Sequence, residues 1–269
     1  MKFLDALKNF LIKTLFLEDI KCIFCDDELN KKSKFCTCEN CLKTLPFNNE
    51  KVCARCGEEI TSMSDLCLNC KDEKKEKYFD QARAPFKYQD EIVGAVHKLK
   101  YSNAKYLGKY LSAFMYEEFL KTTWEIDVVI PVPLNSKRLQ TRGYNQSELL
   151  VNEFKTNGYK IDTTNLIRVV NTPTQTSLSY VERQENLKDA FRVIEPKAFK
   201  NKNILIVDDV CTTGATIENL AKCLKENGAK KVYALTLAKV SLENSLDEWC
   251  NISFQYLSTK FFCLVTRKR

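Results

Sequence analysis

The chain has 269 residues and a mass of 31.1 kDa, enough for one large domain with a small one beside it. Its composition, 44% hydrophobic and 29% charged residues, is typical of a globular protein. No apolar run reaches the roughly 18 residues of a membrane-spanning helix, and the apolar start of the chain lacks a signal-peptide cleavage site. We therefore expect a cytoplasmic protein. Residues 1–77 carry no net charge, so the whole +7 lies in the remainder, where a basic surface would attract phosphates.

Residues 1–20 predict an amphipathic helix. Apolar side chains such as Leu4, Leu7 and Leu11 share one side, and Asp5 and Lys8 lie on the other. We expect this apolar stripe to pack against the protein itself; the alternative role is contact with a membrane surface or a partner.

Residues 21–70 hold nine of the thirteen cysteines. Without an export signal, metal binding is a better interpretation of this density than disulfides. Two Cys-x2-Cys pairs with twelve residues between them are followed by two more pairs with ten between them, and CIFCDDEL resembles CARCGEEI. Four thiolates in two such turns suit tetrahedral zinc, so we expect a double zinc ribbon. The expected ligands are Cys22, Cys25, Cys38, Cys41, Cys53, Cys56, Cys67 and Cys70.

A zinc ion with four cysteine ligands has no open position, so this metal is expected to be structural. One or two ions fit the pattern, because the pairs can combine within each half or between the halves. Cys36 is left over and could replace Cys38. The ribbons either stabilise this end of the chain or form a platform for nucleic acid or a protein, and Phe24, Phe35 and Phe47 suit stacking as well as a small core.

Residues 71–78 are rich in charge and predict a linker. Residues 79–240 then alternate between strand-like and helix-like segments, which predicts an α/β domain with a mostly parallel sheet flanked by helices. Residues 241–269 form an extension for which we expect no particular structure. The predicted strands are Ala82–Tyr88, Val128–Val132, Leu166–Val170, Ile204–Val207 and Val232–Leu237, and the predicted helices are Tyr106–Leu120, Ser136–Phe154 and Ile217–Asn227.

The segment ILIVDDVCTTGAT, Ile204–Thr216, carries the strongest functional signal. A short apolar strand delivers Asp208 and Asp209 to its carboxyl end, where ligands bind in open parallel sheets. The turn Thr212–Thr216 then leads into a helix, and its N–H and hydroxyl groups suit a phosphate monoester. Gly214 allows the backbone to approach that phosphate closely.

This segment resembles the fingerprint of the type I phosphoribosyltransferases. The resemblance implies a site for 5-phosphoribosyl-1-pyrophosphate (PRPP) with magnesium. Asp208 and Asp209 would face the ribose hydroxyls as the catalytic pair. The 5-phosphate would be held by Thr212, Thr213, Gly214, Ala215 and Thr216.

The segments PVPL (131–134) and RGYNQ (142–146), with the double zinc ribbon, resemble the ComF (ComFC) family of competence proteins over residues 4–240. That resemblance implies a pyrophosphate site formed by Val132, Pro133, Leu134, Asn135, Arg138 and Arg142. It also implies that Asn145 and Gln146 line the cleft, that Arg183 lies on a lid at Thr172–Asn186, and that Lys100 contributes from a basic segment.

The resemblance implies a role in natural transformation, in which single-stranded DNA is handled on the cytoplasmic side of the inner membrane. A translocation helicase and a recombination mediator are the expected protein partners, with peripheral contact to that membrane. A phosphoribosyltransferase would release pyrophosphate, but the acceptor is not visible in the sequence. Two alternatives stay open: a metabolic enzyme that salvages a nucleobase, and a sensor that binds PRPP without turnover.

Overall fold

The computed structural model describes residues 21–29, 34–48, 51–60, 63–72, 76–169 and 190–241. Three regions named above lie outside these residues: the amphipathic segment 1–20, the lid Thr172–Asn186 with Arg183, and nearly all of 241–269. Among the helices of the described part, none is long and apolar enough to cross a membrane.

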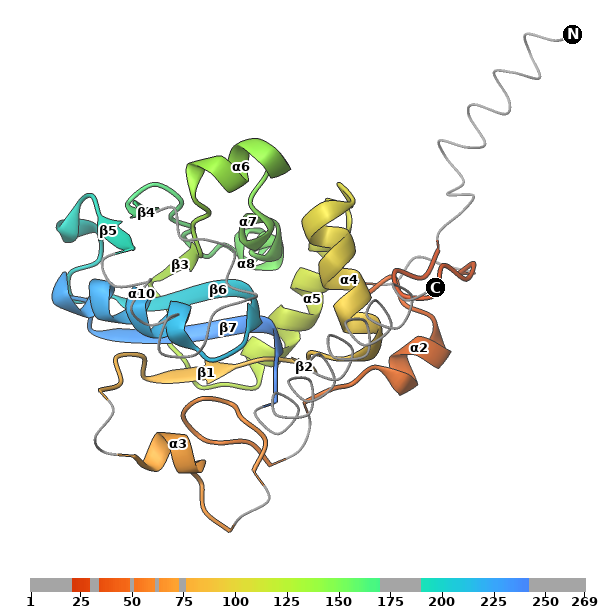
Figure 1. The fold of residues 1–269 in the computed structure, drawn as a ribbon, viewed down its shortest axis with the longest axis horizontal. Coiled ribbons are helices and arrows are strands. Elements are labelled where there is room, and N and C mark those ends of the chain that lie inside the picture. Colours follow the sequence, from red (N-terminus) through yellow and green to blue (C-terminus); the bar gives the residue numbers. More distant parts are fainter. Residues whose placement is uncertain are drawn as a thin grey trace, which may run out of the picture.

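A parallel sheet of five strands forms the centre of the molecule (Figure 1). Its order is β1-β7-β6-β3, and β2 pairs with β7 beyond the end of β1. All of these pairings are parallel, which confirms the predicted sheet type. The strands are β1 (Gln81–Arg83), β2 (Phe86–Lys87), β3 (Val128–Pro131), β6 (Asn203–Cys211) and β7 (Lys231–Lys239).

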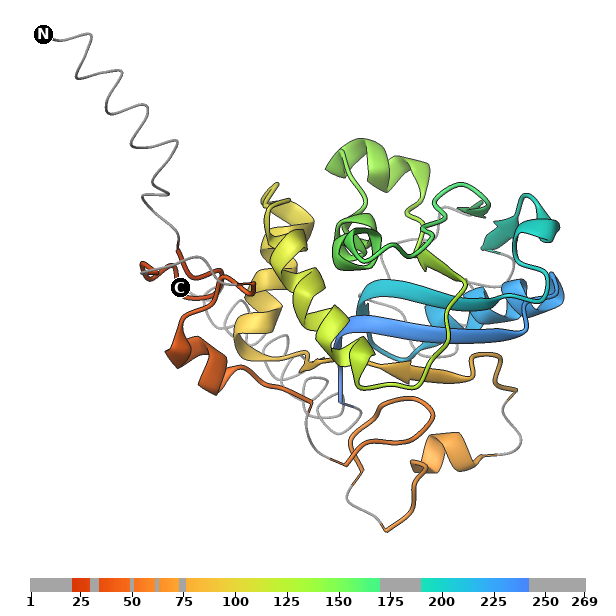
Figure 2. The ribbon, with the colours of Figure 1, turned by 180° about the vertical axis from the view of Figure 1, so that it is seen from behind.

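Both faces of this sheet are covered, which explains why its strands are nearly continuous apolar runs. Side chains alternate along a strand, so Leu205 and Val207 enter one core while Ile204 and Ile206 enter the other. Figures 1 and 2 show helices on opposite faces of the sheet. One face is covered by α4 (Asp90–Tyr101), α5 (Leu107–Leu120), α7 (Gln146–Leu150) and α8 (Asn152–Thr156), and the other by α10 (Ala215–Glu226).

Several sequence expectations for this domain are wrong in detail. The helix predicted over Ser136–Phe154 is three short helices, α6 (Ser136–Arg142), α7 and α8. The first break falls at Gly143, whose φ of +76° ends α6. The run Leu166–Val170 does not join the parallel sheet: β4 (Leu166–Arg168) pairs antiparallel with β5 (Phe191–Val193), which precedes the 3-10 turn Pro196–Ala198.

The predicted strand Ala82–Tyr88 is likewise divided, because Pro85 separates β1 from β2. Helix α4 was not predicted. Its sequence carries the expected charges, since Asp90 and Glu91 lie in its first turn and Lys98 and Lys100 in its last turn. The remaining predicted strands and helices are present, and their ends differ from the prediction by at most four residues.

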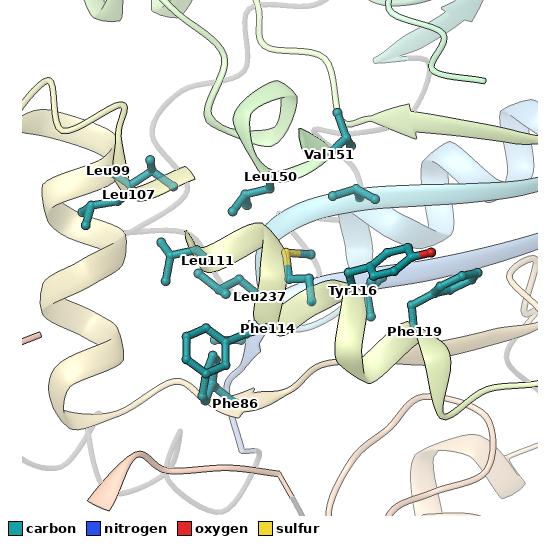
Figure 3. Close-up of a cluster of buried hydrophobic side chains, with 14 of the residues drawn as sticks. Phe86, Leu99, Leu107, Leu111, Phe114, Tyr116, Phe119, Leu150, Val151 and Leu237 are labelled. Carbon is teal, nitrogen blue, oxygen red and sulfur yellow. The ribbon is translucent and has the colours of Figure 1, made fainter. Parts of the chain in front are cut away.

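A cluster of aromatic and aliphatic side chains between α5 and the sheet forms the larger core (Figure 3). Phe114 and Phe119 of α5 point into it, and Phe86 lies against Phe114 with ring centroids 5.1 Å apart. The first cysteine module, which we define as residues 21–48 with helix α2 (Glu39–Thr44), packs on this core. Phe35 stacks on Phe114 at 4.3 Å, and Phe24 meets the same ring edge-on at 6.3 Å. These phenylalanines therefore extend the core.

The second cysteine module, residues 51–72 with helix α3 (Leu68–Lys71), attaches to the open side of β1. The Ala82 N–H donates to the Arg55 carbonyl at 2.6 Å, and the Arg83 side chain donates to the Ala54 carbonyl at 3.1 Å. Lys239, at the end of β7, pairs with Glu58 at 3.2 Å. A side chain at Gly57 would meet the Ala82 carbonyl at 2.8 Å, so this position requires glycine. The module thereby covers an otherwise exposed sheet edge.

Two glycines of neighbouring helices provide a matched test of this packing. A Cβ at Gly108 of α5 would lie 2.5 Å from the Leu149 Cβ, whereas a Cβ at Gly94 of α4 would meet no atom within 4 Å in the part of the chain that the structure describes. Alanine favours a helix over glycine by about 0.5–1 kcal/mol. We expect Gly94→Ala to raise the melting temperature. Gly108→Ala should lower it, because overpacking reduces the free energy of unfolding by about 1–3 kcal/mol. Equal shifts in circular dichroism melts would contradict the tight contact between α5 and α7.

Candidate active site and cysteine clusters

Strand β6 extends beyond its neighbour β3 and carries two carboxylates to that edge of the sheet. Pro131, the last residue of β3, is paired with Val207, so Asp208 and Asp209 come directly after the shared part. The sequence predicts that the strand ends at Val207, but pairing with β7 continues to Cys211. Both carboxylates therefore stand on a rigid strand at the carboxyl ends of the parallel strands, where α/β sheets bind ligands.

Asp209 is buried, and its carboxylate is held from two sides. The Lys100 ammonium lies 2.6 Å from one oxygen, and the Gln146 side-chain amide donates to the other at 2.6 Å. Burial opposes the charge on Lys100, but the two aspartates outweigh this effect and raise its pKa. The structure thus brings together three residues that the sequence assigns to one cleft, from α4, α7 and β6.

Asp208 accepts a hydrogen bond from the Ser147 hydroxyl at 2.9 Å and another from the Asp209 N–H at 2.9 Å. Burial and the neighbouring charge of Asp209 raise its pKa from 3.8 to about 7, although Lys100 and Ser147 oppose this shift. Two adjacent carboxylates are difficult to ionise together in a site of low polarity. Sequence reasoning missed Ser147, although it follows Gln146 directly and lies in the first turn of the same helix.

The turn at 212–216 leads from β6 into the twelve-residue helix α10. Gly214 has a φ of +79°, which glycine adopts without the strain that other residues suffer. A Cβ at this position would meet no atom of the described residues within 4 Å, so that part of the chain leaves the space beside Gly214 open. Thr212 is exposed and Thr213 is half-buried. The first N–H groups of α10 point out of the start of the helix, toward this turn. The sequence prediction of an anion-binding turn fits this geometry.

The segment after β3 divides into structural and exposed residues. Val132 is buried in the core, and its N–H donates to the Val207 carbonyl at 2.9 Å. Asn135 and Asn145 cap α6 and α7 by accepting hydrogen bonds from Arg138 N–H at 2.8 Å and Ser147 N–H at 3.1 Å. Asn145 also donates to the Val132 carbonyl at 3.0 Å. These asparagines shape the loop; Pro133 and Leu134 lie half-buried within it.

Cationic side chains gather around this loop. Arg142 donates to the Gln146 side chain, which links it through Gln146 to Asp209. Arg168 at the end of β4 was not predicted as a site residue. Its guanidinium lies 5.5 Å from the Phe191 ring centroid, and burial together with repulsion from Arg138 lowers its pKa, against attraction to Asp208. Three arginines (Arg138, Arg142 and Arg168) and Lys100 thus accompany the carboxylates.

The cysteines form two separate groups of four, each drawn from one half of the repeat. Within each group the sulfurs lie within 4.8 Å of one another, and the pairs Cys25–Cys38 and Cys56–Cys67 are 3.7 and 3.6 Å apart. A zinc tetrahedron with bonds of about 2.3 Å has edges of about 3.8 Å, so both groups fit this ion. The interleaved pairing is therefore excluded, and Cys36 belongs to neither group.

The two groups also repeat each other in their hydrogen bonds. The Cys38 N–H donates to the Cys22 sulfur at 3.4 Å, and the Cys67 N–H donates to the Cys53 sulfur at 3.3 Å. Burial opposes ionisation of Cys22 and Cys53, but several backbone N–H groups lower the pKa of each thiol to about 7. Burial raises the pKa of Cys25 and of Cys67 to about 11, so in each group one thiol ionises far more readily than its neighbour.

The adjacent carboxylates make opposite predictions for stability. The raised pKa of Asp208 means that its contribution to stability is complete below pH 3.8 and is lost as the pH rises to about 7. Asp208→Asn should therefore stabilise the fold at pH 8 by on the order of 1–3 kcal/mol, and by less at pH 5. Asp209→Asn removes the ion pair with Lys100 and should destabilise it by about 1–3 kcal/mol. Thermal melts at both pH values check this; shifts of the same sign for the two variants would contradict it.

Comparison with known proteins agrees with this geometry. Residues 156–262 match the family model of the phosphoribosyl transferase domain. Competence protein F of Haemophilus influenzae is 29% identical over 233 residues, which cover 82% of this chain and 97% of that protein. The DNA utilization protein YhgH of Escherichia coli is 31% identical over 197 residues, or 71% and 85% of the two chains. Competence protein ComFC of Streptococcus pneumoniae is 28% identical over 232 residues, or 82% and 100%.

Solved structures match only in part. An allosteric regulatory enzyme of purine biosynthesis is 22% identical, with a TM-score of 0.32, over 53% of this chain and 26% of that chain. A hypoxanthine phosphoribosyltransferase of Staphylococcus aureus is 17% identical, with a TM-score of 0.28, over 53% and 64%. The extent of the matches to the competence and DNA utilization proteins decides the assignment: the chain belongs to the family of ComF competence proteins and YhgH DNA utilization proteins, and it carries a type I phosphoribosyltransferase domain.

Proposed function

We propose that this protein binds PRPP with magnesium at the end of β6 and handles incoming single-stranded DNA during natural transformation. PRPP binding is supported most directly by the position of the two carboxylates near the end of β6. Lys100 pairs with one of them, and the turn 212–216 follows directly after the strand. The support for the DNA role is the family, whose members are named for competence and DNA utilization.

The proposed binding mode follows the order of groups along the sheet edge. Asp208 and Asp209 accept hydrogen bonds from the two ribose hydroxyls, since each carboxylate oxygen has a second lone pair beside its present contact. The turn 212–216 and the start of α10 hold the 5-phosphate. Arg138 and Arg142 lie on the segment after β3, where they neutralise the diphosphate.

The residues present also fit a magnesium ion that arrives with the diphosphate. Two carboxylates face each other's charge here, and Lys100 is the cation that pairs with them among the described residues. Carboxylate oxygens are the donors that magnesium prefers. When bound, the ion supplies charge neutralisation for the leaving diphosphate.

In a transfer reaction, the bond between ribose C1 and the diphosphate oxygen breaks, and its electron pair leaves with pyrophosphate. An acceptor nucleophile then forms the new bond to C1. The protein's own contribution is to orient the ribose through Asp208 and Asp209 and to exclude water at a site backed by the buried end of β6. The carboxylates also stabilise the positive charge that develops on the ribose.

For the cysteine groups we propose one structural zinc ion each. Both modules are small and attach to the transferase domain through surfaces that the metal-bound turns would hold in shape: Phe35 on Phe114, and Arg55 on Ala82. The Lys239–Glu58 ion pair further links the second module to β7, beside Cys211 at the end of β6. Loss of the second zinc ion would thus disturb the contact of Lys239 with Glu58, close to Cys211, after which the turn 212–216 begins.

Zinc content tests this assignment. The purified full chain is expected to hold two zinc ions by inductively coupled plasma mass spectrometry. Cys25→Ser and Cys56→Ser should each retain one ion and melt at a lower temperature, because the affected module loses its fold. Cys36→Ser is the control and should retain both ions, since the Cys36 thiol donates to the Lys21 carbonyl instead. A loss of zinc in Cys36→Ser, or a single ion in the wild type, would contradict two four-cysteine sites.

The cellular role is tested by Asp208→Asn combined with Asp209→Asn. We expect PRPP binding, measured by isothermal titration calorimetry with magnesium, and transformation frequency both to fall by more than tenfold, since the ribose loses two charged acceptors. Glu195→Gln with Glu226→Gln is the matched control, because it removes two exposed carboxylates elsewhere. Normal transformation despite lost PRPP binding would contradict the proposal that this site serves DNA uptake.

Incubation of PRPP with a panel of nucleobases separates the remaining alternatives. Pyrophosphate release with one base would favour a salvage enzyme. Binding of PRPP without release, together with unchanged transformation, would favour a sensor.

A further inference from the structure

Two segments without any acidic residue face each other beside the candidate active site. Residues 97–109 contain four lysines, and residues 134–145 contain one lysine and two arginines. Helix α4 ends in the first segment and α6 lies in the second. We call the surface that they form the basic corner; its cations are Lys98, Lys100, Lys105, Lys109, Lys137, Arg138 and Arg142.

Three side-chain interactions join these segments into one surface. The Tyr144 hydroxyl donates to the Leu99 carbonyl, the Arg142 guanidinium lies 5.3 Å from the Tyr101 ring centroid, and the Lys105 ammonium lies 4.9 Å from the Tyr144 ring centroid. In Figures 1 and 2, the end of α4 likewise lies beside α6 and α7. The arrangement interleaves cations with aromatic rings.

Aromatic rings at this corner are exposed to solvent. Tyr101 is 66% exposed and Tyr106 is 60% exposed, whereas the neighbouring Tyr144 is buried. His97 is also exposed, and its ring centroid lies 4.9 Å from that of Tyr101. Tyrosines usually bury much of their ring surface, so two rings that are more than half exposed among lysines offer accessible surface for stacking.

The basic corner is continuous with the carboxylate site. Lys100, which pairs with Asp209, precedes Tyr101 in the chain. Arg142, which lies over Tyr101, donates to Gln146, and Gln146 donates to Asp209. Tyr101 therefore lies at the edge of the site, next in sequence to Lys100, which pairs with the Asp209 carboxylate.

We propose that the basic corner binds single-stranded nucleic acid, with bases stacked on Tyr101 and Tyr106 and phosphates on the flanking cations. Exposed rings bind unstacked bases, which a duplex does not present, and the cations match the charge of the backbone. The proposal rests on the DNA role proposed above and assigns that role to α4, α5 and α6. Bound there, the single-stranded nucleic acid would lie at the edge of the proposed PRPP site.

The test is fluorescence anisotropy of the full chain with labelled oligothymidine. Tyr101→Ala and Tyr106→Ala are expected to weaken binding by roughly 5- to 100-fold each, because each removes one stacking surface. Tyr101→Phe keeps the ring and should bind within about twofold of the wild type. Since both tyrosines are largely exposed, the melting temperatures of these variants should stay unchanged.

Charge variants test the binding of phosphates separately. Lys105→Gln with Lys109→Gln should reduce the slope of log affinity against log salt by about 0.7 for each lysine that neutralises a phosphate in the wild type. Lys197→Gln with Lys200→Gln removes two exposed lysines that follow β5, whose buried residues belong to the other core from those of α4, and should leave the slope unchanged.

The outcomes distinguish this inference from the proposed function. If the wild type binds no oligothymidine at low salt, both fail. If the wild type binds and the tyrosine variants bind equally well, only the basic corner is overturned, and the DNA role stands. Equally strong binding of a duplex would overturn the stacking on Tyr101 and Tyr106.

Discussion

The ion pair between Lys100 and Asp209 is the contact on which the site depends. It joins α4 to β6 across the end of the sheet, with a separation of 2.6 Å. Two adjacent carboxylates at a buried strand end repel each other, and without compensation they would protonate or disrupt the fold. Lys100 supplies a charge, while Gln146 and Ser147 supply hydrogen bonds from α7. The raised pKa of Asp208 shows that this compensation is incomplete. A site held in this state favours a ligand that brings hydroxyl donors and a cation.

The two cysteine modules are attached to the transferase domain in different ways. The first rests on the aromatic cluster around Phe114, and the second forms backbone hydrogen bonds to β1. Within its described residues neither module has an extensive apolar core of its own, so contacts with the transferase domain, together with the proposed zinc ions, would hold it in shape. Lys239 connects the second module to the end of β6, because its ammonium lies near both Glu58 and Cys211. The second cysteine module and the end of β6, from which the turn 212–216 starts, are therefore connected through Lys239.

Local patterns predicted much of this arrangement. The apolar run before Asp208 gave the central strand, the glycine-containing turn gave the start of α10, and the Cys-x2-Cys spacing gave two four-sulfur groups. The single helix predicted over Ser136–Phe154 was wrong because Gly143 adopts a positive φ that no periodicity reveals. The strand Leu166–Val170 was misplaced because an apolar run does not specify its pairing partner. Ser147 and Arg168 approach Asp208 only through tertiary contacts, which lie outside the reach of a local pattern.

We propose that the end of β6 recognises PRPP as a whole. Thermal unfolding of the full chain in magnesium with increasing PRPP tests it most directly, because a ligand that binds the folded state alone raises its stability by about 2.7 kcal/mol at one hundred times the dissociation constant. We predict a melting temperature that keeps rising with the logarithm of the PRPP concentration, and a much smaller rise with ribose 5-phosphate, which lacks the diphosphate. An unchanged melting temperature at every PRPP concentration would contradict recognition of PRPP at this site.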